Sequence, residues 1–456
     1  MFVIFAAAAA AQLPTISDAA AQPLTISQAV EQALRNYPSI RVSQEQMNAA
    51  AAGIRLAQTA YLPRVDSLLQ VNRSTRNTFY GLLLPQGVIS NVDGVAGNNL
   101  GTVWNSGAGV LVSWQPFDFG LRAANVAIAN AAHAEAQATL NRTRYEVSIA
   151  AADAFLTVLA AQQTAQAARA AVDSWQTLLR SIHALVSSQL RAGADESRVQ
   201  AESAAAQTQV AEAEQATAVA RATLALFVGG NANEVPLNSG RLLAELPAER
   251  TEPALDASLN PLARQQISLI AQQQKQLDAV GRTYYPQFLL QGEAAARGTG
   301  LVNDGSRLGE LNGLAPTTQN YAFGLTVTFP VMDRYAVQAQ EAQETANLHA
   351  DQAQYQVITE NLESQFRTAQ ANLAGARRVA NNTPVQVAAA RAALEQGTAR
   401  YRSGLAPIDD VAQAQRLLVQ AQIDDSLARL NVWRAQLQLD SVRGDIQPFV
   451  AAATSP

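Results

Sequence analysis

The segment Tyr321-Ala322-Phe323-Gly324-Leu325-Thr326-Val327-Thr328-Phe329 alternates large apolar side chains with small or hydroxyl-bearing ones. A period of two predicts a β-strand with one apolar face and one polar face. Strand character extends this segment back to Asn320 and also occupies residues 65–75, 105–114 and 287–296. A tilted strand needs about ten residues to cross the apolar core of a bilayer. The alternation is therefore typical of the lipid-facing and lumen-facing positions of a membrane β-barrel.

The strands belong to an arrangement that occurs twice along the chain. Pro38 and Pro63 recur as Pro261 and Pro286, each pair 223 residues apart, which predicts an internal two-fold structural repeat. We divide the chain into a first repeat at 22–230 (strand hairpin 65–114, helical hairpin 121–227), an inter-repeat linker or equatorial segment at 231–258, a second repeat at 259–444 (strand hairpin 287–329, helical hairpin 335–439) and a C-terminal tail at 445–456.

Aromatic residues gather at the ends of the predicted strands, where the two interfacial girdles of a membrane barrel would lie. Each strand hairpin also encloses a long loop, at 79–99 and 298–318, and prolines stand at the opposite strand ends. We expect these loops, which contain Asn91 and Asn303, to face the outside. The alternative is a soluble β-hairpin that packs its apolar face on a core. The candidate interface residues are Trp114, Phe117, Tyr284, Tyr285, Tyr321 and Phe329.

Between the strand hairpins the chain predicts very long helices. Residues 121–190 contain no proline and no glycine, and apolar or small residues recur there in alternating steps of four and three, which is a heptad seam. Pro384 should kink or split the long helix of the second repeat. The seams are rich in alanine, whose burial contributes little, so we expect other helices to surround them in an assembly. Four strands per chain leave open edges, and three chains would close a shared 12-stranded barrel.

Composition excludes several classes of protein. The 456 residues carry a net charge of −5 and form no basic patch, so nucleic-acid binding is not expected. Cysteine is absent and the three histidines are far apart, so we expect no disulfide, no metal site and no cofactor. Without any catalytic constellation, the chain is not expected to be an enzyme. Residues 1–21 are expected to be a secretory signal peptide, with a floppy alanine-rich tail as the alternative.

One charged pair stands out, because Asp409 and Asp410 follow a predicted helical turn at Gly404. Acidic residues are favoured at a helix N-terminus by the macrodipole alone, which is the purely structural interpretation. The functional interpretation depends on where the turn lies in an assembly.

The chain resembles the TolC-like outer-membrane efflux protein family, also called outer membrane factors. The resemblance runs from about Leu24 to Gly444 and rests on these motifs: Leu24-Thr25-Ile26-Ser27-Gln28-Ala29-Val30, Asn36-Tyr37-Pro38, Tyr61-Leu62-Pro63, Tyr401-Arg402-Ser403-Gly404, Asp410-Val411 and Ala414-Gln415.

The resemblance implies a homotrimer in the bacterial outer membrane, mainly α with a membrane β-barrel. Its antiparallel helical hairpins would form a periplasmic tube that closes at the helical turns. A periplasmic adaptor (membrane fusion protein) and an inner-membrane transporter would be its partners. Asp410 matches a family carboxylate at the tunnel entrance. A second family carboxylate, three residues further on, is Gln413 here, so the resemblance implies a weaker acidic ring unless Asp409 substitutes for it. The turn residues Arg191, Gly193, Tyr401, Arg402, Gly404 and Val411 are then candidates for adaptor docking.

We therefore expect an exit duct of a tripartite efflux pump or a type I secretion system. It would conduct its cargo passively, with drugs, metal ions and polypeptides all open as cargo. The alternative is a secreted, soluble coiled-coil scaffold without a pore.

Overall fold

The structure is a computed structural model that describes residues 23–75, 101–190, 192–229, 236–250, 253–302, 306, 308–309 and 311–454. The expected signal peptide, the whole loop at 79–99 with Asn91, and the loop residue Asn303 lie outside this part. The described residues group into two compact units: residues 1–44, 138–265 and 355–456 belong to unit 1, and residues 45–137 and 266–354 to unit 2. Both sequence repeats contribute to both units.

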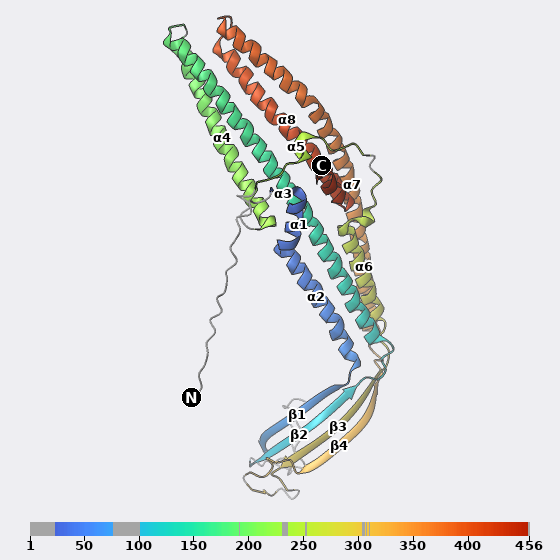
Figure 1. Ribbon diagram of the computed structural model, residues 1–456. Coiled ribbons are helices and arrows are strands. Elements are labelled where there is room, and N and C mark those ends of the chain that lie inside the picture. Colours follow the sequence, from blue (N-terminus) through green and yellow to red (C-terminus); the bar gives the residue numbers. More distant parts are fainter. Residues whose placement is uncertain are drawn as a thin grey trace, which may run out of the picture. The chain divides into compact units, whose positions relative to one another are not determined.

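Unit 2 contains a four-stranded antiparallel sheet in the order β1-β2-β3-β4, whose strands lie side by side in Figure 1. The strands are β1 (Arg64–Thr75), β2 (Thr102–Trp114), β3 (Gln287–Thr299) and β4 (Thr318–Thr328). Both strand hairpins are therefore found within a few residues of their expected bounds, and β2 pairs with β3 to join the two repeats.

The register confirms the two-faced pattern. Val65 pairs with Val112, Val112 with Gly292 and Gly292 with Phe323, so these positions share one face of the sheet. The next row along the sheet, which contains Asp66 and Glu293, lies on the other face. The apolar face carries Val65, Leu69, Val71, Val110, Val112, Trp114, Phe288, Leu290, Tyr321, Phe323, Leu325 and Val327.

Proline and polar caps set the helix boundaries. Thr25 and Gln28 form a capping box at the start of α1 (Ile26–Asn36). Pro38 and Pro261 are the first residues of α2 (Pro38–Gln58) and α6 (Pro261–Val280), where a proline loses no helical hydrogen bond. Pro63 and Pro286 directly precede β1 and β3. The repeated prolines thus have the same structural role in both repeats.

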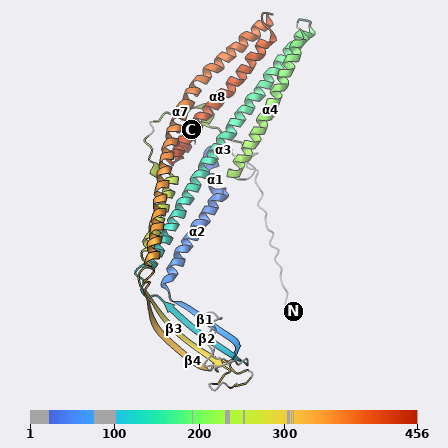
Figure 2. The same cartoon turned by 180° about the vertical axis from the view of Figure 1, so that it is seen from behind.

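The long helices form two antiparallel pairs. Helix α3 (Leu121–Ser187) is followed by α4 (Gly193–Val228), and α7 (Arg334–Arg402) by α8 (Ile408–Arg443). Within unit 1 each pair lies side by side in both views (Figures 1 and 2). The predicted seams are buried: Val147, Ala151, Val158, Trp175 and Ile182 of α3 are all at most 5% exposed. Helix α7 continues through Pro384, so of the two expected outcomes, a kink or a split, the split does not occur.

Short elements complete unit 1. The inter-repeat segment contains α5 (Arg241–Ala244) and the 3-10 turn η2 (Ala257–Leu259). The residues expected as a tail include α9 (Gln447–Thr454), whose Phe449 is fully buried against Trp433. Among the described residues, no helix combines the length and the apolar character that a membrane span requires.

Candidate functional site

The tip of unit 1 is where both helical hairpins turn. Helix α3 ends at Ser187 and α4 begins at Gly193, while α7 ends at Arg402 and α8 begins at Ile408. Gly404 has a φ of +78°, a left-handed conformation that favours glycine. Gly193, in contrast, is the first residue of α4. The two predicted turn glycines therefore differ in conformation.

A tyrosine joins the two hairpins at this tip. Tyr401 is only 2% exposed, and its hydroxyl donates a 2.9 Å hydrogen bond to a carboxylate oxygen of Asp195 in the first turn of α4. Around it lies an apolar cluster drawn from α3, α4, α7 and α8. The cluster comprises Ala171, Trp175, Ile182, Val199, Ala206, Tyr401, Ile408, Val411 and Ala412.

A chain of alternating charges also connects α4 with α8. Asp409 lies 3.2 Å from Arg198, and Glu202 lies 3.9 Å from Arg198 and 3.1 Å from Arg416. All of these side chains except Glu202 are largely exposed, so each ion pair contributes little on its own. The chain of ion pairs runs from Asp409 of α8 through Arg198 and Glu202 of α4 back to Arg416 of α8.

The predicted gate residues lie close together but have different surroundings. Asp409 and Asp410 are both exposed in the first turn of α8. Asp409 is engaged with Arg198, whereas Asp410 forms no ion pair with any side chain that the structure describes. Gln413 is exposed one turn further along α8. Of the two aspartates, Asp410 is thus the exposed carboxylate without an ion-pair partner among the described side chains.

The docking candidates are divided between surface and core. Arg402, Gly193 and Gly404 are exposed, whereas Tyr401 and Val411 are buried in the tip cluster and act as its supports. Arg191 lies outside the described residues. Two exposed leucines that the prediction did not include stand at the turns, Leu190 at 70% and Leu405 at 73% exposure.

A groove of about 720 Å³ lies between α3 and α4 on one side and α8 on the other. Trp175 and Gln413 line it together with Arg416 and Glu212. Gln413 thus faces the space between the helical hairpins. A grouping of side chains that could hold a metal ion does not occur among the described residues.

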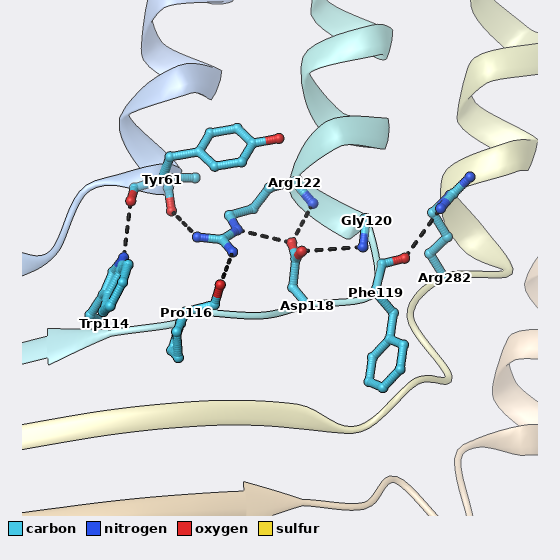
Figure 3. Close-up of polar contacts among 9 residues, drawn as sticks. Tyr61, Trp114, Pro116, Asp118, Phe119, Gly120, Arg122 and Arg282 are labelled. Atoms are coloured by element: carbon cyan, nitrogen blue, oxygen red, sulfur yellow. Dashed lines mark hydrogen bonds and ion pairs between the residues drawn. The ribbon is translucent and has the colours of Figure 1, made fainter.

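The second candidate region is the junction in unit 2 where β2 leads into α3 (Figure 3). Arg122 and Asp118 form a buried ion pair of 3.0 Å, with side chains 9% and 11% exposed. The Arg122 guanidinium also donates to the carbonyl oxygens of Ala60 and Pro116, at 3.3 and 3.4 Å, and stacks over the ring of Tyr61. One side chain therefore ties the end of α2 to the end of β2.

Asp118 fixes the start of α3 at the same junction. Its carboxylate accepts hydrogen bonds from the backbone N–H groups of Gly120 and Arg122, at 3.2 and 2.6 Å. Burial acts to raise the pKa of Asp118, but these hydrogen bonds and the Arg122 guanidinium outweigh it and hold the pKa below its ordinary value. On the other side, Arg282 donates to the carbonyl of Phe119 at 3.2 Å (Figure 3).

The predicted interface aromatics are exposed at two levels of the sheet. Tyr321 is 91% exposed near the loop end of β4, and Phe329 is 63% exposed just beyond its other end. Trp114, Phe117, Tyr284 and Tyr285 lie at the helix-proximal end with 37–54% exposure. The Trp114 indole donates to the carbonyl of Tyr61 at 3.0 Å, which orients its ring. The rings remain proposed membrane-interface residues.

Sequence reasoning missed the polar partners of these sites. The sequence alone gives no signal for Asp195, Arg198 and Glu202, because the partners that they contact in the other hairpin are distant along the chain. The Asp118–Arg122 pair has the i,i+4 spacing of many surface pairs, so only its burial distinguishes it. The aspartate two residues after Pro116 was the available signal, as a cap for the helix that begins at Leu121.

With the fold and these regions described, known proteins provide a comparison. A family model described as "Outer membrane efflux protein" matches residues 29–230 and 258–445, which is most of the chain. The chain belongs to this family. It is thus an outer-membrane protein of a family of efflux channels rather than of enzymes. The two matched segments correspond to the two repeats. No curated protein matches the chain significantly.

Solved structures show the same fold at low sequence identity. The Neisseria gonorrhoeae MtrE outer membrane channel in its open state has a TM-score of 0.71 and 18% identity, covering 92% of this chain and 89% of its own. VceC from Vibrio cholerae has a TM-score of 0.71 and 16% sequence identity, over 92% of this chain and 96% of the VceC chain. The Campylobacter jejuni CmeC outer membrane channel has a TM-score of 0.72 and 13% sequence identity, over 92% of this chain and 85% of the CmeC chain.

Proposed function

We propose that this outer membrane efflux protein forms a homotrimeric exit duct. It conducts its cargo passively from a periplasmic adaptor and an inner-membrane transporter to the outside, in a tripartite pump or a type I secretion system. Three copies supply twelve strands to one barrel, and the helices of unit 1 line a periplasmic tube.

The observation that carries the proposal is the open sheet with its apolar face. In the described strands, β1 and β4 are outer strands of the sheet and have one ladder partner each. In lipid, such unpaired backbone edges are not tolerated, so further strands must close the sheet. Two copies would give eight strands with a lumen filled by side chains, whereas three leave an open lumen.

A soluble scaffold fits this face poorly. Phe323 and Leu325 are 77% and 58% exposed, next to Tyr321 at 91%. Such a contiguous apolar surface is typical of an interaction with lipid or with a partner, rather than with water. Leu190 and Leu405 are exposed at the helical turns, and such apolar side chains favour the docking of a partner protein there.

A matched pair of substitutions tests the barrel. Leu325 lies on the apolar face of β4 and Thr326 on the opposite face. An arginine on the lipid face costs about 2–4 kcal/mol at the bilayer midplane, whereas lumen positions tolerate charge. Leu325→Arg should abolish insertion and trimer formation, while Thr326→Arg should insert and conduct in planar bilayers. Equal behaviour of the two variants, or a wild-type monomer in mild detergent, contradicts the proposal.

Labelling of intact cells tests the orientation, because the chain has no cysteine of its own. Leu311 is 73% exposed in the described part of the loop between β3 and β4. A cysteine at Leu311 should react with a membrane-impermeant reagent on intact cells. A cysteine at Leu405 should react only after the outer membrane is permeabilised, and the reverse pattern would invert the orientation.

A further inference from the structure

Helix α7 contains a built-in weak point at Pro384. A proline in a helix interior cannot donate the hydrogen bond that the carbonyl four residues earlier would accept, which here belongs to Ala380. The neighbouring hydroxyl of Thr383 lies 3.4 Å from that carbonyl and 2.7 Å from a carboxylate oxygen of Asp425 in α8. A hydroxyl has one hydrogen to donate, and the shorter contact with the charged acceptor is the stronger one.

The bond between Thr383 and Asp425 is partly buried, and a neighbouring residue supports it. Thr383 is 4% exposed. The second carboxylate oxygen of Asp425 lies 3.2 Å from the guanidinium of Arg429, one turn further along α8. We call the Thr383–Asp425 pair the latch. It connects α7 to α8 next to the residue where α7 is weakest.

Packing between α7 and α8 changes at the latch. On the side away from the tip, a large cluster includes Ile358, Leu362, Phe366 and Leu373 of α7 with Val432 of α8. On the tip side, the next cluster is smaller: Ala390, Leu418 and Ala421 are buried, and Val387 and Leu394 of α7 pack against them. This cluster has fewer buried residues than the first, so α7 buries less apolar area against α8 between Pro384 and the tip cluster.

The inter-repeat segment reinforces this difference. Residues 241–249, which we call the strap, cross α7 and α8 on the side of the latch away from the tip. Trp433 donates to the carbonyl of Glu245 at 2.9 Å, and Arg429 to that of Ala244 at 3.5 Å. Arg377 of α7 donates to the carbonyl of Ala248 at 3.2 Å and lies 3.3 Å from the carboxylate of Glu249.

We propose that α7 pivots at Pro384 when the duct opens: the strap holds the base of the second helical hairpin, and residues 385–402 swing once the latch and the hydrogen bond from Tyr401 to Asp195 are released. This inference rests on the proposed duct function, because it assigns the movement of the tip to one residue. Kinks in helices have identifiable causes such as proline, and here the proline lies between the strapped base and the smaller cluster around Ala390.

Spin-label distances test the pivot directly. Spin labels are attached to cysteines at Ala399 of α7 and Asn431 of α8, both of which are exposed. The distance between these labels measures the position of the tip of α7 relative to the base of the hairpin. Ala399 lies about 22 Å of helix beyond Pro384, so a swing of about 20° would move it by about 8 Å. Labels at Ala184 and Ala218 report the hairpin of α3 and α4, which contains no proline.

Thr383→Val keeps the shape of the side chain and removes the latch, so it should widen the Ala399–Asn431 distances by several ångströms. Pro384→Ala restores the helical hydrogen bond and should narrow them. The Ala184–Ala218 distances should stay the same in both variants. Unchanged Ala399–Asn431 distances, or equal widening of both pairs, would overturn the pivot.

Bilayer recordings of the same variants separate the pivot from the duct. Thr383→Val should raise the open fraction and Pro384→Ala should lower it. If the protein never conducts, the proposed duct function is contradicted. The Ala399–Asn431 spin-label distances still decide separately whether α7 bends at Pro384. Normal conduction with unchanged distances keeps the duct and removes the pivot.

Discussion

The hydroxyl of Tyr401 in the last turn of α7 donates a 2.9 Å hydrogen bond to the carboxylate of Asp195 in the first turn of α4. The two residues are 206 positions apart and belong to different repeats. Because Tyr401 is buried at the centre of the tip cluster, this bond holds the two helical hairpins together at the end where both hairpins turn.

Tyr401→Phe should loosen the tip without a change in its packing volume. A hydrogen bond to a charged group contributes about 1.5–3 kcal/mol, and its loss leaves the Asp195 carboxylate without this donor. We expect a lower thermal unfolding temperature and a larger single-channel conductance.

Tyr335→Phe is the matched control, since Tyr335 is 77% exposed in the first turn of α7. Asp195→Asn keeps an acceptor oxygen and should have a smaller effect than Tyr401→Phe. A Tyr401→Phe protein that conducts and unfolds like the wild type would show that the tip is held by packing alone.

The entrance carboxylates should have unequal roles. Three copies of Asp410 would form a ring that attracts cations into a constriction. Asp410→Ala should therefore reduce cation selectivity and the block by divalent or trivalent cations, and Asp409→Ala with Asp410→Ala should do so at least as strongly. The measurement is the reversal potential in salt gradients across a planar bilayer.

Asp409→Ala alone is the informative comparison. It removes the partner of Arg198 and leaves Asp410 in place, so we expect a smaller change in selectivity and a looser contact between α4 and α8. If the double variant keeps the selectivity and block of the wild type, the two aspartates serve only the helix dipole, an effect of a few tenths of a kcal/mol.

The two turn glycines offer a conformational test. Gly404 has a φ of +78°, so Gly404→Ala forces a side chain into a left-handed conformation that costs about 1–2 kcal/mol. Gly193 starts α4, and a Cβ there meets nothing within 4 Å. Gly193→Ala should be neutral or slightly stabilising in thermal unfolding. Equal destabilisation by both substitutions would contradict this account of the turns.

Local patterns were enough to predict the helices and strands. The alternation from Tyr321 to Phe329 fixes the face of β4 because a strand has a period of two, and the seam from Val147 to Val186 fixes the buried side of α3. Each signal lies within a single helix or strand, so it can be recognised without knowing which other elements pack against it. The same reasoning located Asp409 and Asp410 at the start of α8.

Contacts between elements could not be predicted in the same way. Asp195 is one of many acidic residues until Tyr401 is placed beside it, and Asp118 with Arg122 has the spacing of a solvent-exposed pair. Pro384 predicts a kink or a split in a helix, and α7 remains one helix through it. These features depend on burial, which a single sequence does not contain.

The junction of β2 with α3 should be sensitive to acid. The folded-state pKa of Asp118 is below its ordinary value, so its ionised form stabilises the fold. This contribution is complete above the unfolded-state pKa of about 3.9 and is lost as the pH falls from there through the folded-state pKa.

Removing one partner of a buried ion pair costs about 3–5 kcal/mol, so Arg122→Met should strongly lower the unfolding temperature at pH 7. Asp118→Asn should lower it less, because an amide oxygen can still accept from the Gly120 N–H, and its unfolding temperature should change less than that of the wild type between pH 5 and pH 2. Arg282→Met, which removes an exposed donor to the Phe119 carbonyl, is the control and should keep the acid sensitivity of the wild type. The same acid-induced drop in wild type and Asp118→Asn would show that another carboxylate sets the acid limit.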